Sequence, residues 1–126
     1  MRHRIMAAVL IVAHAPLASA LRDVAAHVYA GCAHAVVALD VGPEATQEAV
    51  RDAARAIIAA GAERDWLVLT DVFGATPCNA ALQVSDPLHV RVVAGVNVPM
   101  LWRTLCYADE PLESLVARAV GGATQG

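Results

Sequence analysis

Four short apolar runs, each followed by a segment with helical spacing, constrain this chain more than any other feature. The first run, at residues 5–12, is continuously apolar, which is typical of a strand covered on both faces. Strands that alternate with helices favour a parallel sheet sandwiched between helical layers. We therefore expect an α/β fold, with strands at 5–12, 35–39, 66–70 and 90–94. The first helix would carry apolar residues at 17, 21, 24 and 28 and end at Gly31, and further helices are expected at 44–60, 77–83, 99–107 and 111–120.

The expected sheet is doubly wound and mainly parallel, with its four strands in the order 2-1-3-4 and helices on both faces. The chain has 126 residues, which is the length of about one domain. We assign residues 1–120 to this single domain. The remaining segment, 121–126, is small and polar, and we expect it to be a frayed tail.

The charge balance excludes several classes of function. The chain has no lysine, which removes a P-loop, a Schiff base and every other mechanism that needs an amine. Its nine arginines are scattered and its net charge is −3, so it lacks the basic footprint of a nucleic-acid-binding protein. The mean hydropathy is +0.53, largely from alanine, but no run reaches the roughly 18 apolar residues of a membrane span. We expect no membrane insertion.

The first twenty residues also resemble a secretory signal peptide. A basic start, an apolar run and the small residues at 17–20 fit that pattern. His14 and Pro16 interrupt the apolar run, however, and cleavage would remove the first strand, so we favour a buried strand. The three cysteines form no close pair, and their odd number fits a reducing compartment: Cys32, Cys78 and Cys106.

Two titratable side chains follow neighbouring strands of the expected sheet. His14 ends the first strand and Asp71 ends the third, and ligands bind beyond such strand ends in an open parallel sheet. A carboxylate bound to one ring nitrogen fixes the tautomer and leaves the other nitrogen as a nucleophile. Pro16 is expected at the first helical position, with Ala15 as the cap, so free helix amides would attract an anion beside His14. The alternatives are a histidine satisfied by a loop carbonyl and a capping aspartate.

A second helix start lies in the loop after the third strand. Thr76 is expected to be the N-cap, with Pro77 at the first helical position, and Gly74 permits a tight loop. These residues would aim a hydroxyl and further backbone amides at the same region. Together with His14 and Asp71, the pattern predicts transient phosphorylation of His14.

Three ordered segments carry a resemblance to a known family. They read Ile-Val-Ala-His-Ala-Pro-Leu at 11–17, Leu-Val-Leu-Thr-Asp-Val-Phe-Gly-Ala-Thr-Pro-Cys-Asn at 67–79 and Ala-Gly-Val-Asn-Val-Pro-Met-Leu at 94–101. The chain resembles the mannose-family IIA components of the bacterial phosphoenolpyruvate-dependent sugar phosphotransferase system. The resemblance implies a cytoplasmic protein that takes a phosphoryl group from the phosphocarrier HPr onto His14. It would then pass the group to a IIB domain or protein.

The resemblance also implies roles for the residues around His14. Asp71 would orient the ring, and Thr76, with Gly74 and Ala15, would lie beside the phosphate. Asn97 would contribute a polar group at the rim of the site. Phe73 is placed by its position in the loop near the site, where it would shield the phosphohistidine, contact a partner protein or pack in the core. No metal and no cofactor are implied, and a homodimer is expected, in some members with an exchanged C-terminal strand.

Two positions depart from the family pattern. Ala13-His14-Ala15 stands where the family usually has Thr-His-Gly, and Gly74-Ala75 stands where it usually has two glycines. Alanine adopts a positive φ less easily than glycine, so the geometry of both loops is open at this point.

Other functions remain open on the sequence alone. The leading alternative is a regulatory module in which a binding partner reads the phosphorylation state of His14 without sugar transport. A dihydroxyacetone-kinase phosphotransfer subunit and a flavodoxin-like ligand-binding domain fit the motifs less well. The sequence does not indicate which sugar the system would take up. No functional role is expected for the other histidines: His3, His27, His34 and His89.

Overall fold

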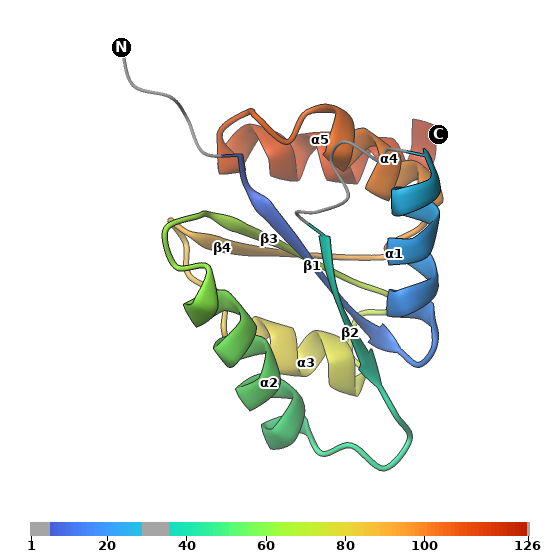
Figure 1. Cartoon of the computed structure of the whole chain (residues 1–126), viewed down its shortest axis with the longest axis vertical. Helices are drawn as coiled ribbons and strands as arrows, with labels where there is room; N and C mark the ends of the chain where they lie inside the picture. Colours follow the sequence, from blue (N-terminus) through green and yellow to red (C-terminus); the bar gives the residue numbers. More distant parts are fainter. Residues whose placement is uncertain (1–5, 29–35, 126) are drawn as a thin grey trace.

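A four-stranded parallel sheet forms the centre of the molecule (Figure 1). A computed structural model describes residues 6–28 and 36–125 of the chain. The strands are β1 (Ala8–His14), β2 (Val36–Val41), β3 (Trp66–Thr70) and β4 (Val90–Ala94). They lie in the order β2-β1-β3-β4, and every neighbouring pair is parallel. The predicted strand order is confirmed.

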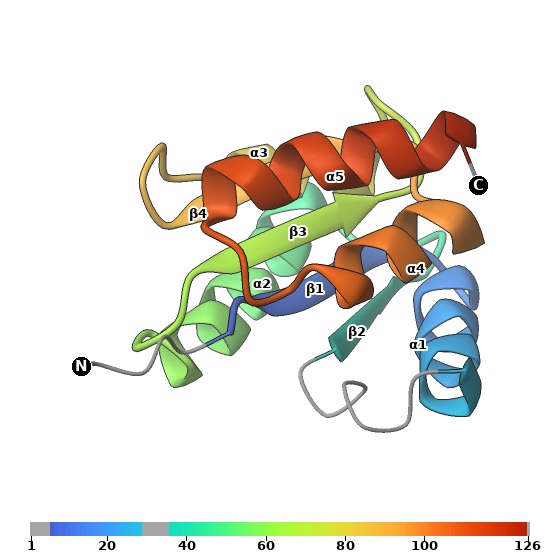
Figure 2. The same ribbon diagram turned by 90° about the horizontal axis from the view of Figure 1, so that it is seen from above.

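Within the described residues, five helices cover the two faces of this sheet (Figures 1 and 2). α1 (Leu17–Val28), α4 (Val98–Cys106) and α5 (Leu112–Gln125) form one layer. α2 (Gln47–Ala60) and α3 (Thr76–Leu82) form the other. The molecule is therefore the expected three-layer α/β sandwich. No helix in the described ranges has the length and apolar character that spanning a membrane requires.

The continuous apolar run of β1 is explained by its place in the sheet. Val9 and Ile11 pack into the core under α1, α4 and α5, whereas Leu10 and Val12 pack under α2 and α3. All four side chains are fully buried. Because successive side chains of a strand point to opposite faces, a strand covered on both sides needs apolar residues at every position. The buried-strand interpretation of the N-terminal run is thus confirmed.

The register of the strands brings the ends of β1 and β3 to one edge of the sheet. Val12 pairs with Thr70 across β1 and β3, and His14 pairs with Val41 across β1 and β2. The segments that follow β1, β2 and β3 therefore begin side by side at this edge of the sheet. This edge is where a ligand would be expected in an open parallel sheet.

The C-terminus differs from the expectation. The last helix was expected to end near residue 120, but α5 continues to Gln125, and only residue 126 of the expected frayed tail lies outside the described residues. Gly122 is buried, and a Cβ placed on it would lie 2.6 Å from the Cβ of Arg103 on α4. The small residues that suggested a tail are what allow α4 and α5 to pack closely.

Candidate active site

His14 and Asp71 form a hydrogen-bonded pair at the carboxyl edge of the sheet. His14 Nδ1 lies 2.7 Å from Asp71 Oδ2, and the backbone amide of His14 donates to the same oxygen at 3.0 Å. The Val72 amide donates to Asp71 Oδ1 at 2.9 Å. Both carboxylate oxygens are therefore fixed, and the ring of His14 is held by its Nδ1 edge. The structure brings together the two residues that the strand order predicted to meet.

The environment of Asp71 keeps its carboxyl group charged. Partial burial is the largest single influence and raises the pKa of Asp71, but three hydrogen bonds lower it: those from the His14 ring, the His14 amide and the Val72 amide. Together they hold the pKa below its ordinary value of 3.8. An ionised carboxylate only accepts hydrogen bonds, so Nδ1 of His14 is the donor, and the neutral ring in this tautomer has its lone pair on Nε2.

Exposure separates the two members of the pair. The side chain of His14 is 51% exposed, whereas that of Asp71 is 14% exposed. A reagent as large as a protein can therefore reach the imidazole, while the carboxylate that orients it is shielded. This arrangement suits nucleophilic attack by Nε2 on an incoming group.

The turn after β1 is built differently from the expectation. The Pro16 carbonyl accepts from the Ala20 amide at 3.0 Å, so Pro16 is the cap of α1, and Leu17 is its first helical residue. The Ala15 amide donates to the Val41 carbonyl at 2.9 Å, and the Ala15–Pro16 peptide bond is cis. The amide of Ala15 is consequently tied to β2 and is not directed at a ligand.

A carboxylate from β2 occupies the N-terminus of α1. Asp40 Oδ1 accepts from the Ser19 amide at 3.0 Å, and Asp40 Oδ2 accepts from the Ser19 hydroxyl. The hydroxyl bond, followed by the amide bond, holds the pKa of Asp40 below its ordinary value. A helix N-terminus favours a negative charge, and here the protein supplies that charge itself. Of the helix amides that were expected to be free for an anion, the Ser19 amide is therefore already bound.

The sequence reasoning missed Asp40 and Ser19 as positioning residues. Asp40 pairs with Ala13 in the β1–β2 register, so it stands one residue before the level of His14. Its bonds to Ser19 fix α1 relative to the two strands and thereby fix the turn at His14. A serine three residues into a helix carries little signal, but an acidic residue at the end of a neighbouring strand could have suggested this contact.

The loop between β3 and α3 carries the remaining expected residues. Gly74 has φ +90°, a conformation that favours glycine, and Asn79 Nδ2 donates to its carbonyl at 3.3 Å. Ala75, with φ −96°, is the cap of α3, and Thr76 is its first residue, so Thr76 is not the N-cap that was expected. Since Ala75 has a negative φ, alanine suits this position, and the departure from the family's glycine pair causes no strain here.

Two apolar side chains of the same loop project into solvent. Phe73 is 77% exposed and Val72 is 51% exposed. Both follow Asp71 directly in the chain, so they lie beside the His14 pair. The core-packing alternative for Phe73 is therefore wrong. The other two alternatives stay open, which are contact with a partner protein and shielding of a group on His14.

Asn97 is engaged within the fold. Its Oδ1 accepts from the Met100 amide at 2.8 Å and caps α4, and its Nδ2 donates to the Ala123 carbonyl at 3.2 Å. Both ends of the amide therefore connect α4 and α5. Within the described ranges, no three histidine, cysteine or acidic side chains gather as metal ligands do.

Comparison with known proteins gives a consistent result. The model of the family EIIA-man, described as PTS system fructose IIA component, matches residues 8–120. The PTS system mannose-specific EIIAB component of Escherichia coli K12 is 44% identical over 63 residues, which cover 48% of this chain and 20% of that protein. The chain thus spans about a fifth of the length of the curated relatives that it matches.

Two solved structures share the whole fold. A phosphotransferase system component EIIA from Streptococcus agalactiae has a TM-score of 0.81 at 24% identity, over 96% of this chain and 95% of that one. A mannose/sorbose-specific IIA subunit from Enterococcus faecalis has a TM-score of 0.85 at 21% identity, over 94% and 90% of the two chains. At these identities, the likeness concerns the fold. The family match covers all four strands and both members of the His14–Asp71 pair, and on this ground the chain belongs to the EIIA-man family, as a mannose-family IIA component of the phosphotransferase system.

Proposed function

We propose that the chain is a phosphoryl relay in which His14 accepts a phosphoryl group and then passes it on. The observation that carries this proposal is the 2.7 Å bond from His14 Nδ1 to Asp71 Oδ2, on a ring that is half exposed. Family membership supports a phosphotransfer role in sugar uptake. The bond at Nδ1 supports Nε2 as the atom that would react.

The transfer step follows from the protonation of the pair. The lone pair of His14 Nε2 attacks phosphorus while the bond between phosphorus and the donor breaks, and the donor keeps that electron pair. The ring then carries the phosphoryl group on Nε2 and its original proton on Nδ1, so it is positively charged. Asp71 balances this charge, and no proton has to move. Position and electrostatic stabilisation account for such a transfer without further covalent chemistry.

The donor and the acceptor complete the proposal. Phospho-HPr would be the donor and a IIB domain or protein the acceptor, with both reactions at Nε2. The exposed Phe73 and Val72 beside the site offer an apolar surface to partners of this size. A cytoplasmic location and a homodimer are part of the same proposal, because the relay partners imply the first and the family resemblance implies the second.

The test is phosphorylation from phosphoenolpyruvate through enzyme I and HPr, followed by intact mass. We expect one added phosphoryl group on the wild type and none on His14→Ala. His89 provides a matched control, because its Nδ1 lies 2.9 Å from Asp65 Oδ1 at the opposite edge of the sheet. His89→Ala should be labelled like the wild type. A labelled His14→Ala protein, or an unlabelled His89→Ala protein, would overturn the assignment.

A second measurement separates transport from regulation. The phosphorylated protein is mixed with a IIB protein, and the phosphoryl group is followed by mass. Transfer to IIB is the expected result. Retention of the group on His14, with IIB unlabelled, would instead favour the regulatory module that reads the phosphorylation state.

A further inference from the structure

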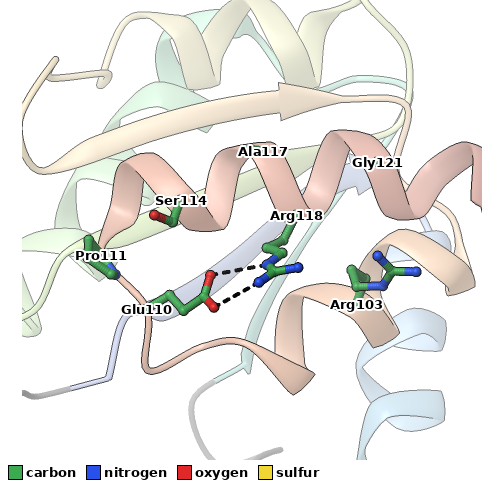
Figure 3. A pocket seen from close by; sticks show the side chains of 7 residues that line it. All are labelled: Arg103, Glu110, Pro111, Ser114, Ala117, Arg118 and Gly121. Carbon is green, nitrogen blue, oxygen red and sulfur yellow. Dashed lines mark hydrogen bonds and ion pairs between the residues drawn. The ribbon is translucent and has the colours of Figure 1, made fainter.

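A groove lies between α4 and α5 (Figure 3). Its volume is about 620 Å³, which is within the usual range for small-molecule sites. None of the residues that line it belongs to the His14–Asp71 pair or to the loops around that pair. Whatever this groove binds would therefore be distinct from the phosphoryl chemistry at the sheet edge.

Small side chains on α5 leave room for a ligand. Ser114, Ala117 and Gly121 follow one another at spacings of three and four, so they share one face of the helix. A Cβ added to Gly121 would meet no atom within 4 Å. These small side chains leave space over this face of α5. Ser114 supplies a hydroxyl at one end of the groove, and Ala117 and Gly121 supply apolar surface beyond it.

The guanidinium of Arg118 is held rigidly at this groove. Its Nε and Nη2 donate to the two carboxylate oxygens of Glu110, each at 3.1 Å, and its central carbon lies 3.8 Å from the centre of the Tyr107 ring. Within the described ranges, Nη1 has no hydrogen-bond partner. A planar group fixed on one side can therefore offer its remaining N–H donors to a ligand at little entropic cost.

Arg103 supplies a second guanidinium from α4. In Figure 3, Arg118 lies between Glu110 on one side and Arg103 on the other. The stem of Arg103 packs against Gly122, but its guanidinium makes no hydrogen bond or ion pair with any residue that the structure describes. Arg103 is half-buried, and a partly buried cation without a partner is better stabilised with an anion beside it.

Charge and geometry together indicate the class of ligand. Two arginines and one glutamate give the groove one uncompensated positive charge, although the whole chain has a net charge of −3. Guanidinium groups bind carboxylate and phosphate oxygens in a bidentate manner. We propose that the α4–α5 groove binds a small organic anion, whose carboxylate or phosphate lies between Arg103 and Arg118 and whose carbon skeleton lies along Ser114 and Ala117.

The test is a titration followed by ¹⁵N–¹H NMR on the whole chain. The probes are glycerol 3-phosphate and glycerate, which offer a phosphate monoester and a carboxylate on similar skeletons, with glycerol as the neutral control. We expect saturable shifts at the amides of Ser114, Ala117 and Gly121 with at least one anion and none with glycerol. The anion that binds more tightly identifies the preferred group. Absence of saturable shifts with both anions would overturn the proposal.

Variants link the binding to the two guanidinium groups. Arg103→Gln keeps the part of the stem that packs against Gly122, so it should fold, and we expect it to weaken binding about tenfold or more. Arg55→Gln removes an exposed charge on α2, in the opposite layer, and should leave affinity unchanged. Equal affinities for Arg103→Gln and the wild type, or equal losses in Arg103→Gln and Arg55→Gln, would refute the assignment.

Discussion

The clearest test of the His14 site is Asp71→Asn, which keeps the shape of the side chain and removes its charge. Oδ2 of Asp71 accepts two hydrogen bonds, from the ring and the amide of His14, whereas Oδ1 accepts one, from the Val72 amide. An asparagine must place its NH₂ group at one of these positions. Losing one bond costs less than losing two, so we expect its oxygen to face His14 and the tautomer of His14 to persist.

In the proposed relay, what Asp71→Asn loses is the negative charge that would balance the phosphorylated, positively charged ring of His14. Two unit charges 4 Å apart attract by about 1 kcal/mol in water and about 4 kcal/mol near a protein surface. Because the ring is 51% exposed, we take the attraction that Asp71→Asn removes to be about 1–3 kcal/mol. A change of 1.36 kcal/mol in the barrier is a factor of ten in rate, so phosphorylation should slow roughly 5- to 150-fold.

The assay is the single-turnover rate of transfer from phospho-HPr, measured by rapid quench. Asp65→Asn is the matched control, since it removes the carboxylate of the His89 pair at the other edge of the sheet. Its transfer rate should equal that of the wild type. If Asp71→Asn transfers within twofold of the wild-type rate, the carboxylate does not stabilise the charged ring, and the role given to Asp71 is refuted.

Three further predictions concern packing, surface and pH. Gly122→Ala should lower the free energy of unfolding by about 1–3 kcal/mol in urea denaturation, because its Cβ would meet α4 at 2.6 Å, whereas Gly121→Ala, with open space, should not destabilise. Phe73→Ser should leave the Tm unchanged, since the side chain is 77% exposed, but should slow transfer from phospho-HPr; an unchanged rate would remove Phe73 from the partner surface. The hydrogen bond that His89 donates to Asp65 raises the pKa of His89 above 6.5, so the pair stabilises the fold below about pH 6.5 and loses this effect as the pH rises through the folded-state pKa. NMR titration of Asp65→Asn should show the pKa of His89 returning towards 6.5; no change would contradict the bond.

The parts of the structure that the sequence predicted depend on local patterns. A continuous apolar run marks a strand buried on both faces, and β1 has this pattern because it lies between β2 and β3. Once the strand order is known, the meeting of His14 and Asp71 follows from chain position alone. The fold and the central pair of the site could therefore be predicted without coordinates.

The parts that were missed depend on contacts between distant segments. Asp40 and Ser19 are 21 positions apart, and only the sheet register brings this carboxylate to the start of α1. Residues 121–124 look like a polar tail because nothing in their own composition shows that Gly122 must fit against another helix. In both cases, the determining partner lies on another element, and single-sequence periodicity does not report it.

The two carboxylates of the site differ in how their charges are balanced, and this difference suits a relay. Asp40 is bound to the amide and hydroxyl of Ser19, so its charge is compensated whether or not His14 is modified. In the proposed relay, Asp71 faces a positively charged ring while Nε2 carries the phosphoryl group and Nδ1 keeps its proton. When the group leaves, Nε2 regains its lone pair, and the proton stays on Nδ1. The same pair can therefore accept the group and release it with no change in its own protonation, as transfer in both directions requires.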